Sequence, residues 1–245
     1  AEDGIRDLVR SRGLGDVYKR QVRKGRIRGY SMLVVDDGST DGTGELLATL
    51  SRKFMRLQVI TLRKNRGVVK ATLAALTEIS KSAHADGIVV RMDSDFEHNP
   101  EDIERLIGPV REGKCAMCFA YLSPDLGQGT AFSLMNLIVG GYENLKLFGK
   151  WVPQFCPGYY AIGAGALKRS LPKLRRAASA YRKMFGSEMI GIDIFLGTLA
   201  QKLGGTCFIK ASPVRKEWLT GKPFSKTGRY VREHIRMMRF LNSKF

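Results

Sequence analysis

The sequence predicts an α/β fold with a largely parallel sheet and helices on both of its faces. Short apolar runs alternate with segments of helical periodicity along most of the chain, and several of these runs end in turn sequences. Strand–helix–strand units of this kind join parallel strands. The chain has 245 residues, of which 44% are hydrophobic, so it is long enough to bury a sizeable core. We expect a single domain over residues 22–245.

The alternation is clearest in the first half of the chain. Apolar runs predict strands over residues 30–35, 57–62, 87–92 and 115–121. Helices are predicted from Thr40 or Asp41, either of which can cap, to about Lys53, over 68–83, and from Asn99-Pro100 to about 107. Beyond residue 123 the pattern predicts helices over 132–147 and 193–203, strands over 158–162 and 206–211, and a basic helix from about Gly228.

The net charge is strongly positive, because 41 lysine and arginine residues outnumber 23 aspartate and glutamate residues, which gives +18. Such a charge indicates an anionic partner, which could be nucleic acid, acidic lipid or a phosphate-bearing substrate. The sequence contains no signature of a nucleic-acid-binding module and no aromatic–basic platform, which argues against nucleic acid.

The cysteines and the hydropathy pattern bear on the compartment. Cys115 and Cys118 form a single C-x-x-C in an apolar run, with no second pair or neighbouring histidine, and are interpreted as buried core thiols. No apolar run reaches the roughly 18 residues of a membrane-spanning helix, and the printed sequence does not begin with a secretory signal. We therefore expect a reducing, cytoplasmic location, with the cytoplasmic face of a membrane as the alternative.

Residues 1–21 differ in character from the start of a domain. They resemble the in-frame translation of a sequencing-library adapter joined to a transposon end, since residues 15–21 back-translate to GGAGATGTGTATAAGAGACAG. We expect this leader to be non-native and the natural start of the domain to be missing.

Two pairs of carboxylates follow directly on predicted strands. Asp36 and Asp37 end the first strand, and Asp93 and Asp95 follow the third. Ligands of open α/β sheets bind where strands end, and an Asp-x-Asp pair on extended backbone can reach one cation. Oxygen ligands suit magnesium or manganese, which neutralise charge on a diphosphate leaving group. The alternative is that these residues only form acidic turns, or that Asp95 caps a helix.

Three ordered segments resemble the motifs of the family 2 glycosyltransferases, which have the GT-A fold. Residues 34–43 read VVDDGSTDGT, like the signature of that family, and residues 65–71 are similar to its N-x-G-x-x-x-A pattern. Residues 92–101, MDSDFEHNPE, resemble the MDADLQHPPE segment of the branch that makes dolichyl- or polyprenyl-phosphate sugars. Residues 157–160, PGYY, more weakly resemble that branch's S-G-F-R segment.

The resemblance implies a role for each matched residue. Asp36 and Asp37 would contact the nucleotide, with Asp36 nearer the base, and Gly38 would let the backbone approach the ligand closely. Asp93 would lie near the ribose and the metal, and Asp95 would bind the metal directly. The nucleotide pocket would also be lined by Arg63, Asn65 and Gly67.

The chain departs from the family pattern in three places. The family's first strand, with a P-x-Y-N-E segment, should precede Tyr30 and is absent, and the arginine-rich stretch after the fourth strand carries no arginine here. The family's R-x-x-G-x-S-K stretch is matched only loosely, by Arg215, Gly221, Ser225 and Lys226. Arg215 and Lys226 are candidates for phosphate contacts or, equally, for a solvated basic surface.

Asp193 opens a late helix at a place where the family often has a carboxylate. Family members usually invert at the sugar carbon by direct displacement, which needs a general base or an already ionised acceptor. Asp193 is the best base candidate and Glu188 a weaker one, while a helix N-cap is an equal interpretation of Asp193. A lipid phosphate acceptor would need no base, because its oxygen is anionic at neutral pH.

The basic C-terminal segment allows two interpretations. A helix there would carry an apolar stripe of Val231, Ile235, Met238 and Leu241 or Phe245, with Arg232, Arg236 and Arg239 off the stripe. Such a helix could lie in an anionic membrane interface, or dock on the domain with a solvated outer face.

The leading hypothesis is an inverting transferase, dependent on magnesium or manganese, that passes a hexose from a UDP- or GDP-sugar to a polyprenyl phosphate. A second hypothesis keeps the donor chemistry but gives the sugar to a saccharide or other hydroxyl acceptor, with Asp193 as base. A third is a non-enzymatic basic module that binds an anionic surface and retains a degenerate pocket.

Overall fold

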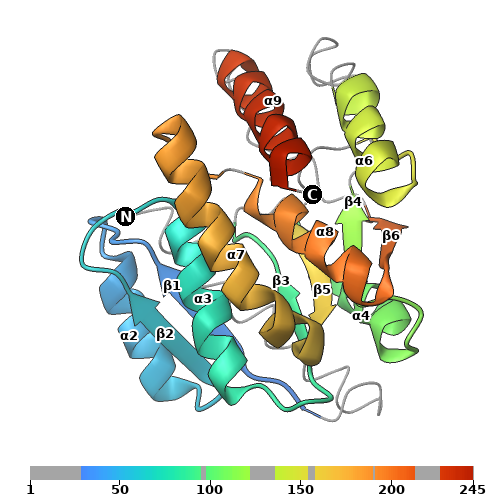
Figure 1. Cartoon of the computed structure of the whole chain (residues 1–245). Coiled ribbons are helices and arrows are strands. Elements are labelled where there is room, and N and C mark those ends of the chain that lie inside the picture. The colour runs from blue at the N-terminus through green and yellow to red at the C-terminus, as the bar shows by residue number, and fades with distance from the viewer. Residues whose placement is uncertain are drawn as a thin grey trace. The chain divides into compact units, whose positions relative to one another are not determined.

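The computed structural model describes residues 29–94, 98–121, 136–153, 158–189, 191–212 and 227–244. These residues belong to two compact units, an N-terminal unit that ends at Ser82 and a C-terminal unit that begins at Ala83. Each unit combines strands with helices (Figure 1), so the predicted α/β fold class is confirmed.

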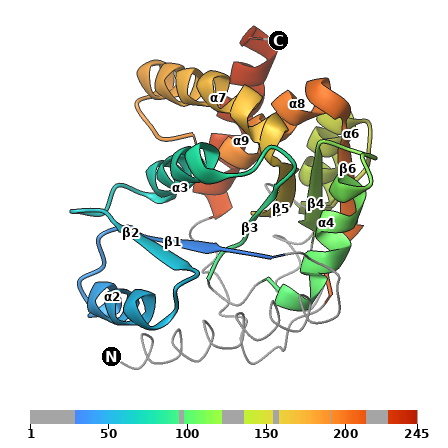
Figure 2. The same cartoon turned by 90° about the horizontal axis from the view of Figure 1, so that it is seen from below.

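The N-terminal unit is built on two parallel strands. Strand β1 (Met32–Asp36) pairs with β2 (Leu57–Thr61), and Asp36 lies opposite Thr61 at the carboxyl end of the pair. Helices α2 (Thr43–Lys53) and α3 (Val68–Ser82) cover opposite faces of this ribbon (Figure 2). Their buried side chains, Leu50 on α2 and Val69 and Leu76 on α3, form the apolar layers of the unit.

The C-terminal unit contains a four-stranded sheet in the order β3-β5-β4-β6. Its strands are β3 (Ile88–Arg91), β4 (Met117–Tyr121), β5 (Tyr159–Gly163) and β6 (Thr206–Lys210). Strand β4 is parallel to β6, whereas β5 is antiparallel to both β3 and β4. The sheet is therefore parallel except for β5. Strand β5 follows a long connection from Tyr121. Such a connection does not require β5 to run parallel to β4, as a short helical crossover would.

Helices cover both faces of this sheet. The 3₁₀ turn η1 (Pro100–Asp102) leads into α4 (Ile103–Arg111), which packs on β3, β4 and β5. Helix α8 (Ile192–Gly204) packs on β4 and β6 from the other face, beside α7 (Ala164–Phe185) (Figure 2). Gly197 of α8 allows this close approach, because a Cβ there would lie 2.7 Å from the Phe119 ring. The remaining helices are the π-helical turn η2 (Asn136–Gly140), α6 (Gly141–Phe148) and α9 (Thr227–Lys244).

Helix α7 is the longest described helix, and the sequence did not predict it. It spans 22 residues, contains Pro172 and has a strongly basic exposed face, features that obscure its apolar pattern. The pattern is nevertheless present, since the buried residues Leu167, Leu171, Leu174, Ala178 and Tyr181 recur every three or four positions.

The C-terminal helix α9 docks on its own unit, which favours the second of the two interpretations for this segment. Its buried residues are Met237, Phe240 and Leu241, whereas Ile235 is 48% exposed, so the buried stripe differs from the predicted one. Phe240 lies 5.5 Å from Tyr181 of α7 and 6.1 Å from Phe195 of α8, measured between ring centroids. Among the described residues, no helix combines the length and apolar character needed to cross a bilayer.

Candidate active site

Asp36 ends β1 with its carboxylate turned into the N-terminal unit. The residue is 4% exposed, and its Oδ1 accepts a hydrogen bond of 3.0 Å from the Ser39 backbone N–H. Its buried Oδ2 has no hydrogen-bond partner within the described part of the chain. A buried carboxylate oxygen without a partner is costly, so this atom is the most obvious acceptor for a ligand donor in the unit.

The next residue, Asp37, fastens the loop after β2 to the end of β1. Its two carboxylate oxygens accept hydrogen bonds of 2.8 Å from Arg66 N–H and 2.7 Å from Gly67 N–H. Asn65 Oδ1 also accepts from Gly67 N–H, at 3.1 Å. The two segments that resemble family motifs in this unit are therefore joined through one carboxylate.

Gly38 is required at the turn between these segments. Its φ is +74°, and a Cβ would lie 2.5 Å from the carbonyl carbon of Lys64 and 2.7 Å from the backbone nitrogen of Asn65. Only glycine fits so close to a backbone in this conformation. The structure thus brings together Asp36, Asp37, Gly38, Asn65 and Gly67, while Arg63 lies exposed in the same loop.

In the C-terminal unit, the central residue of the site is Arg91, the last residue of β3. Its guanidinium contacts Asp93 Oδ1 at 2.7 Å and Asp193 Oδ2 at 3.5 Å, and it donates a 2.6 Å hydrogen bond to the Gly158 carbonyl. Gly158 has no room for a side chain, because a Cβ would lie within 2.8 Å of Asp93 Oδ2. Two of the sequence-predicted aspartates, Asp93 and Asp193, are therefore held by one cation.

Asp193 is buried where α8 begins, and its environment resists ionisation. Burial raises the pKa of this carboxyl and Asp93 raises it further, whereas the positive charge of Arg91 and a contact with the Tyr160 hydroxyl lower it. Burial, followed by the charge of Asp193, also raises the pKa of Tyr160. Within the described residues, Asp193 Oδ1 and the Tyr160 hydroxyl both lack a hydrogen-bond partner of good geometry. These two atoms are further candidates for contact with a ligand.

The loop that follows Asp93 is closed by His98. The Asp93 N–H donates a 2.9 Å hydrogen bond to His98 Nδ1, so the proton of a neutral imidazole lies on Nε2. The His98 ring stacks on Tyr159 of β5 at 4.8 Å, and the Tyr159 hydroxyl donates to the Asn99 carbonyl at 2.9 Å. Both ends of the loop that contains Asp95 are thus anchored, although Asp95 itself lies outside the described residues.

The carboxylate of Asp93 fits a site for a divalent cation that substrate phosphates complete. Its side chain is 41% exposed at the end of β3, and Asp95 lies two residues farther along the same loop. Among the residues that the structure describes, no group of three or more His, Cys, Asp or Glu side chains could hold a metal by itself. Magnesium commonly needs only one or two carboxylates when a diphosphate supplies the remaining oxygens.

Several predicted residues lie elsewhere or cannot be located. Arg215 and Lys226 fall outside the described part of the chain. Glu188, the weaker base candidate, lies 3.6 Å from Arg182 in a partly exposed ion pair. Cys115 and Cys118 are buried free thiols, as predicted, and a hydrogen bond with Cys118 together with burial raises the pKa of Cys115.

The sequence-based reasoning missed Arg91, Tyr160 and His98. Arg91 had a detectable signal, because it interrupts the apolar run of β3 two residues before Asp93 and alternation places the two on one side of an extended segment. Tyr160 is its register partner on β5, which no periodicity in the sequence could reveal. His98 looked isolated because its partner is a backbone N–H.

Comparisons with known proteins show which family the chain resembles. The family model "Glycosyl transferase family 2" matches residues 19–170, which include both pairs of aspartates. Two similar proteins are the undecaprenyl-phosphate 4-deoxy-4-formamido-L-arabinose transferases of Yersinia enterocolitica, 27% identical over 113 residues, and of Yersinia pestis, 31% identical over 113 residues. Each alignment covers 45% of this chain and 33% of the relative.

One match among solved structures is mannosyl-3-phosphoglycerate synthase from Rubrobacter xylanophilus. It has a TM-score of 0.49 and 17% sequence identity, and the match covers 87% of this chain and 64% of that one.

The fold defines an α/β protein, and the family match is more specific. The chain belongs to glycosyl transferase family 2, as its motifs predicted. It spans about a third of the length of the curated relatives that it matches.

Proposed function

We propose that this chain carries the donor site and transfer site of an enzyme that moves a hexose from a nucleotide diphosphate sugar to a polyprenyl phosphate. The observation that carries the proposal is the family match over residues 19–170, which spans Asp36, Asp37, Asp93 and Asp95. The acceptor class is supported by the similar transferases, whose names specify undecaprenyl phosphate.

The residues divide the work in the following way. Asp36, through the Oδ2 that has no partner among the described residues, and the loop held by Asp37 would bind the nucleotide. Asp93 and Asp95 would hold magnesium or manganese, which neutralises charge on the diphosphate. Arg91 would keep Asp93 in position by the 2.7 Å contact between them.

The transfer itself would be a single displacement with inversion. An acceptor phosphate oxygen forms a bond to the anomeric carbon as the bond from that carbon to the diphosphate oxygen breaks, and the nucleoside diphosphate leaves with the electron pair. The acceptor oxygen is already anionic at neutral pH, so no proton must be removed. Asp193 would then act by holding Arg91, since its carboxylate is 9% exposed and 3.5 Å from the guanidinium.

The proposal is tested by offering radiolabelled UDP- and GDP-hexoses to the chain with manganese and three acceptors: a short-chain polyprenyl phosphate, the matching polyprenol and a methyl glycoside. We expect label only in the polyprenyl phosphate product, and its loss in Asp95→Asn. Equal labelling of the polyprenol, or labelling of the glycoside alone, would contradict the proposed acceptor and favour transfer to a hydroxyl group.

Asp193→Asn separates the two acceptor classes. With a phosphate acceptor we expect transfer to slow by less than about tenfold, whereas loss of a general base costs roughly 10²- to 10⁴-fold. The free energy of unfolding should be unchanged or higher at neutral pH, because the amide removes a buried charge that burial disfavours. Transfer kinetics and thermal unfolding of the same variant check both expectations. A variant that transfers slowly and unfolds at a lower temperature than the unmodified chain would refute the expectation on stability.

A further inference from the structure

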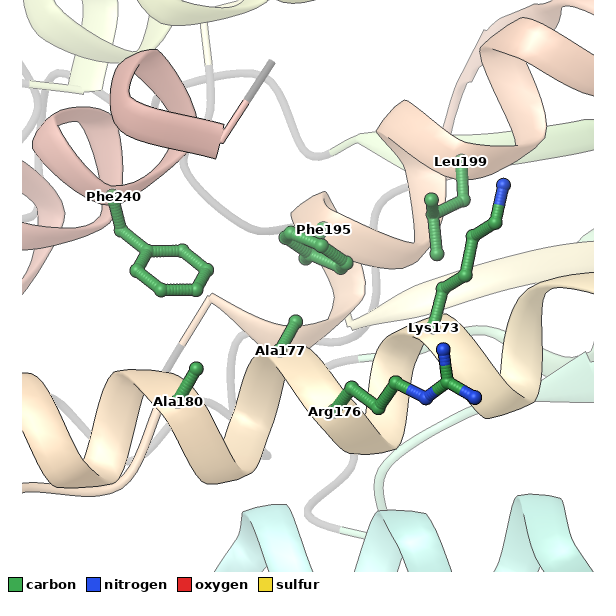
Figure 3. A pocket seen from close by; sticks show the side chains of 7 residues that line it. All are labelled: Lys173, Arg176, Ala177, Ala180, Phe195, Leu199 and Phe240. Carbon is green, nitrogen blue, oxygen red and sulfur yellow. The ribbon is translucent and has the colours of Figure 1, made fainter.

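Three helices of the C-terminal unit enclose a pocket that the proposed transfer chemistry does not use. Its volume is about 410 Å³, within the range of small-molecule sites. The lining residues are Lys173, Arg176, Ala177 and Ala180 of α7, Phe195 and Leu199 of α8, and Phe240 of α9 (Figure 3).

The floor of the pocket is apolar. Phe195, Leu199 and Phe240 line it with carbon, although they are only 3%, 4% and 1% exposed, so a small part of each side chain faces the pocket. The space arises because α9 packs against Tyr181 and Phe195 through Phe240, while α7 contributes only alanine methyl groups at Ala177 and Ala180. A pocket with an apolar floor favours a ligand that places carbon against that floor.

One end of the pocket is cationic. The exposed side chain of Lys173 lies beside Leu199, and that of Arg176 runs along α7 below it, whereas Phe240 and Ala180 lie at the opposite end (Figure 3). Within the described part of the chain, neither Lys173 nor Arg176 forms an ion pair. The surrounding surface has the same sign, because α7 carries seven lysine and arginine residues and no acidic residue.

We propose that this pocket binds an acidic phospholipid, with an acyl chain among Phe195, Leu199 and Phe240 and the phosphate on Lys173 and Arg176. The choice of an acidic phospholipid depends on both the apolar floor and the cationic end of the pocket. A free phosphate would leave the apolar floor unfilled, and a zwitterionic lipid would make poor use of the basic face of α7. The site involves none of the proposed donor or transfer residues, so it stands independently of the proposed function.

The test is flotation of the full chain with vesicles of phosphatidylcholine alone or mixed with phosphatidylglycerol. We expect binding only to the mixed vesicles. Lys173→Gln with Arg176→Gln should weaken it by roughly 10- to 30-fold, because two charge-assisted contacts with the lipid phosphate are lost. Ala180→Phe, which fills the apolar end without changing the charge, should also weaken it by at least fivefold.

Arg169→Gln with Lys183→Gln is the matched control, because it removes two exposed charges from α7 outside the pocket. Circular dichroism and thermal unfolding establish that each variant is folded. An equal loss in the control, or full binding by Ala180→Phe, would overturn the proposal in favour of non-specific surface attraction. Competition by millimolar glycerol phosphate would point to a free phosphate. Self-association abolished by Ala180→Phe would point to a second copy of the chain, and either result would also overturn the proposal.

Discussion

Replacing Arg91 by glutamine is expected to lower the free energy of unfolding by about 3–5 kcal/mol at pH 8. The side chains of Arg91 and Asp193 are only 16% and 9% exposed, so the change leaves a buried carboxylate without its cation. Arg91 also holds Asp93 and the Gly158 carbonyl, and both contacts are lost with it. Thermal and urea unfolding in a chelator-containing buffer measure the change.

The loss of stability caused by Arg91→Gln should become smaller as the pH falls. Burial already raises the pKa of Asp193 above 3.8, and removal of the arginine, which lowers it, raises it further. At a pH between the pKa of Asp193 in the unfolded chain and its higher pKa in the folded protein, the folded state keeps a proton that the unfolded state has released. The free energy of unfolding of the variant therefore rises as the pH falls through this range. Arg169→Gln, which removes an exposed charge from the same unit, should behave like the unmodified chain. If Arg91→Gln unfolded at pH 8 at the same temperature as the unmodified chain, the pair of Arg91 and Asp193 would not be buried in solution.

Asp37→Ala is expected to lower the stability of the N-terminal unit by about 1.5–3 kcal/mol, because two backbone N–H groups lose a charged acceptor. Those groups, on Arg66 and Gly67, fasten the loop after β2 to β1. We also expect nucleotide affinity to fall at least tenfold, since the same loop contains Asn65 and Arg63. Unfolding measurements and a nucleotide titration follow the two effects.

Asp41→Ala is the matched control for Asp37. Its carboxylate also accepts a backbone hydrogen bond, from Thr43 N–H at 3.1 Å, but it is exposed at the start of α2. Asp41→Ala should therefore lose much less stability than Asp37→Ala, and it should keep its nucleotide affinity. Equal losses in both variants would mean that general weakening of the unit, rather than the loop, controls binding.

The sequence was most informative where local pattern decides the structure. The strands that lead to Asp36 and Asp93 were predicted because apolar runs ended directly in acidic turns, and both carboxylates lie at strand ends. Asp41 was one of two predicted caps and accepts from Thr43 N–H, but the N-cap of α2 is Gly42, so the predicted start of this helix was off by one or two residues. These features depend on neighbours a few residues apart, which a sequence displays directly.

Features that depend on distant partners were not predictable in this way. The antiparallel direction of β5 follows from its pairing with β3 and β4, far away in the chain. The role of Arg91 likewise requires Asp193 and Gly158, which are brought to it only by the fold. Helix α7 was missed for a different reason, since Pro172 and the basic residues masked an apolar stripe that the sequence does contain.

The most direct test of the account is a calorimetric titration of the chain with UDP and GDP, with and without manganese. We predict that one nucleotide binds only when manganese is present, and that Asp93→Asn and Asp95→Asn abolish this binding without unfolding the protein. Asp86→Asn, at an exposed turn before β3, should bind normally. If a folded chain bound nucleotide equally well without manganese and with either substitution, the result would contradict a metal-dependent donor site. It would favour a degenerate pocket.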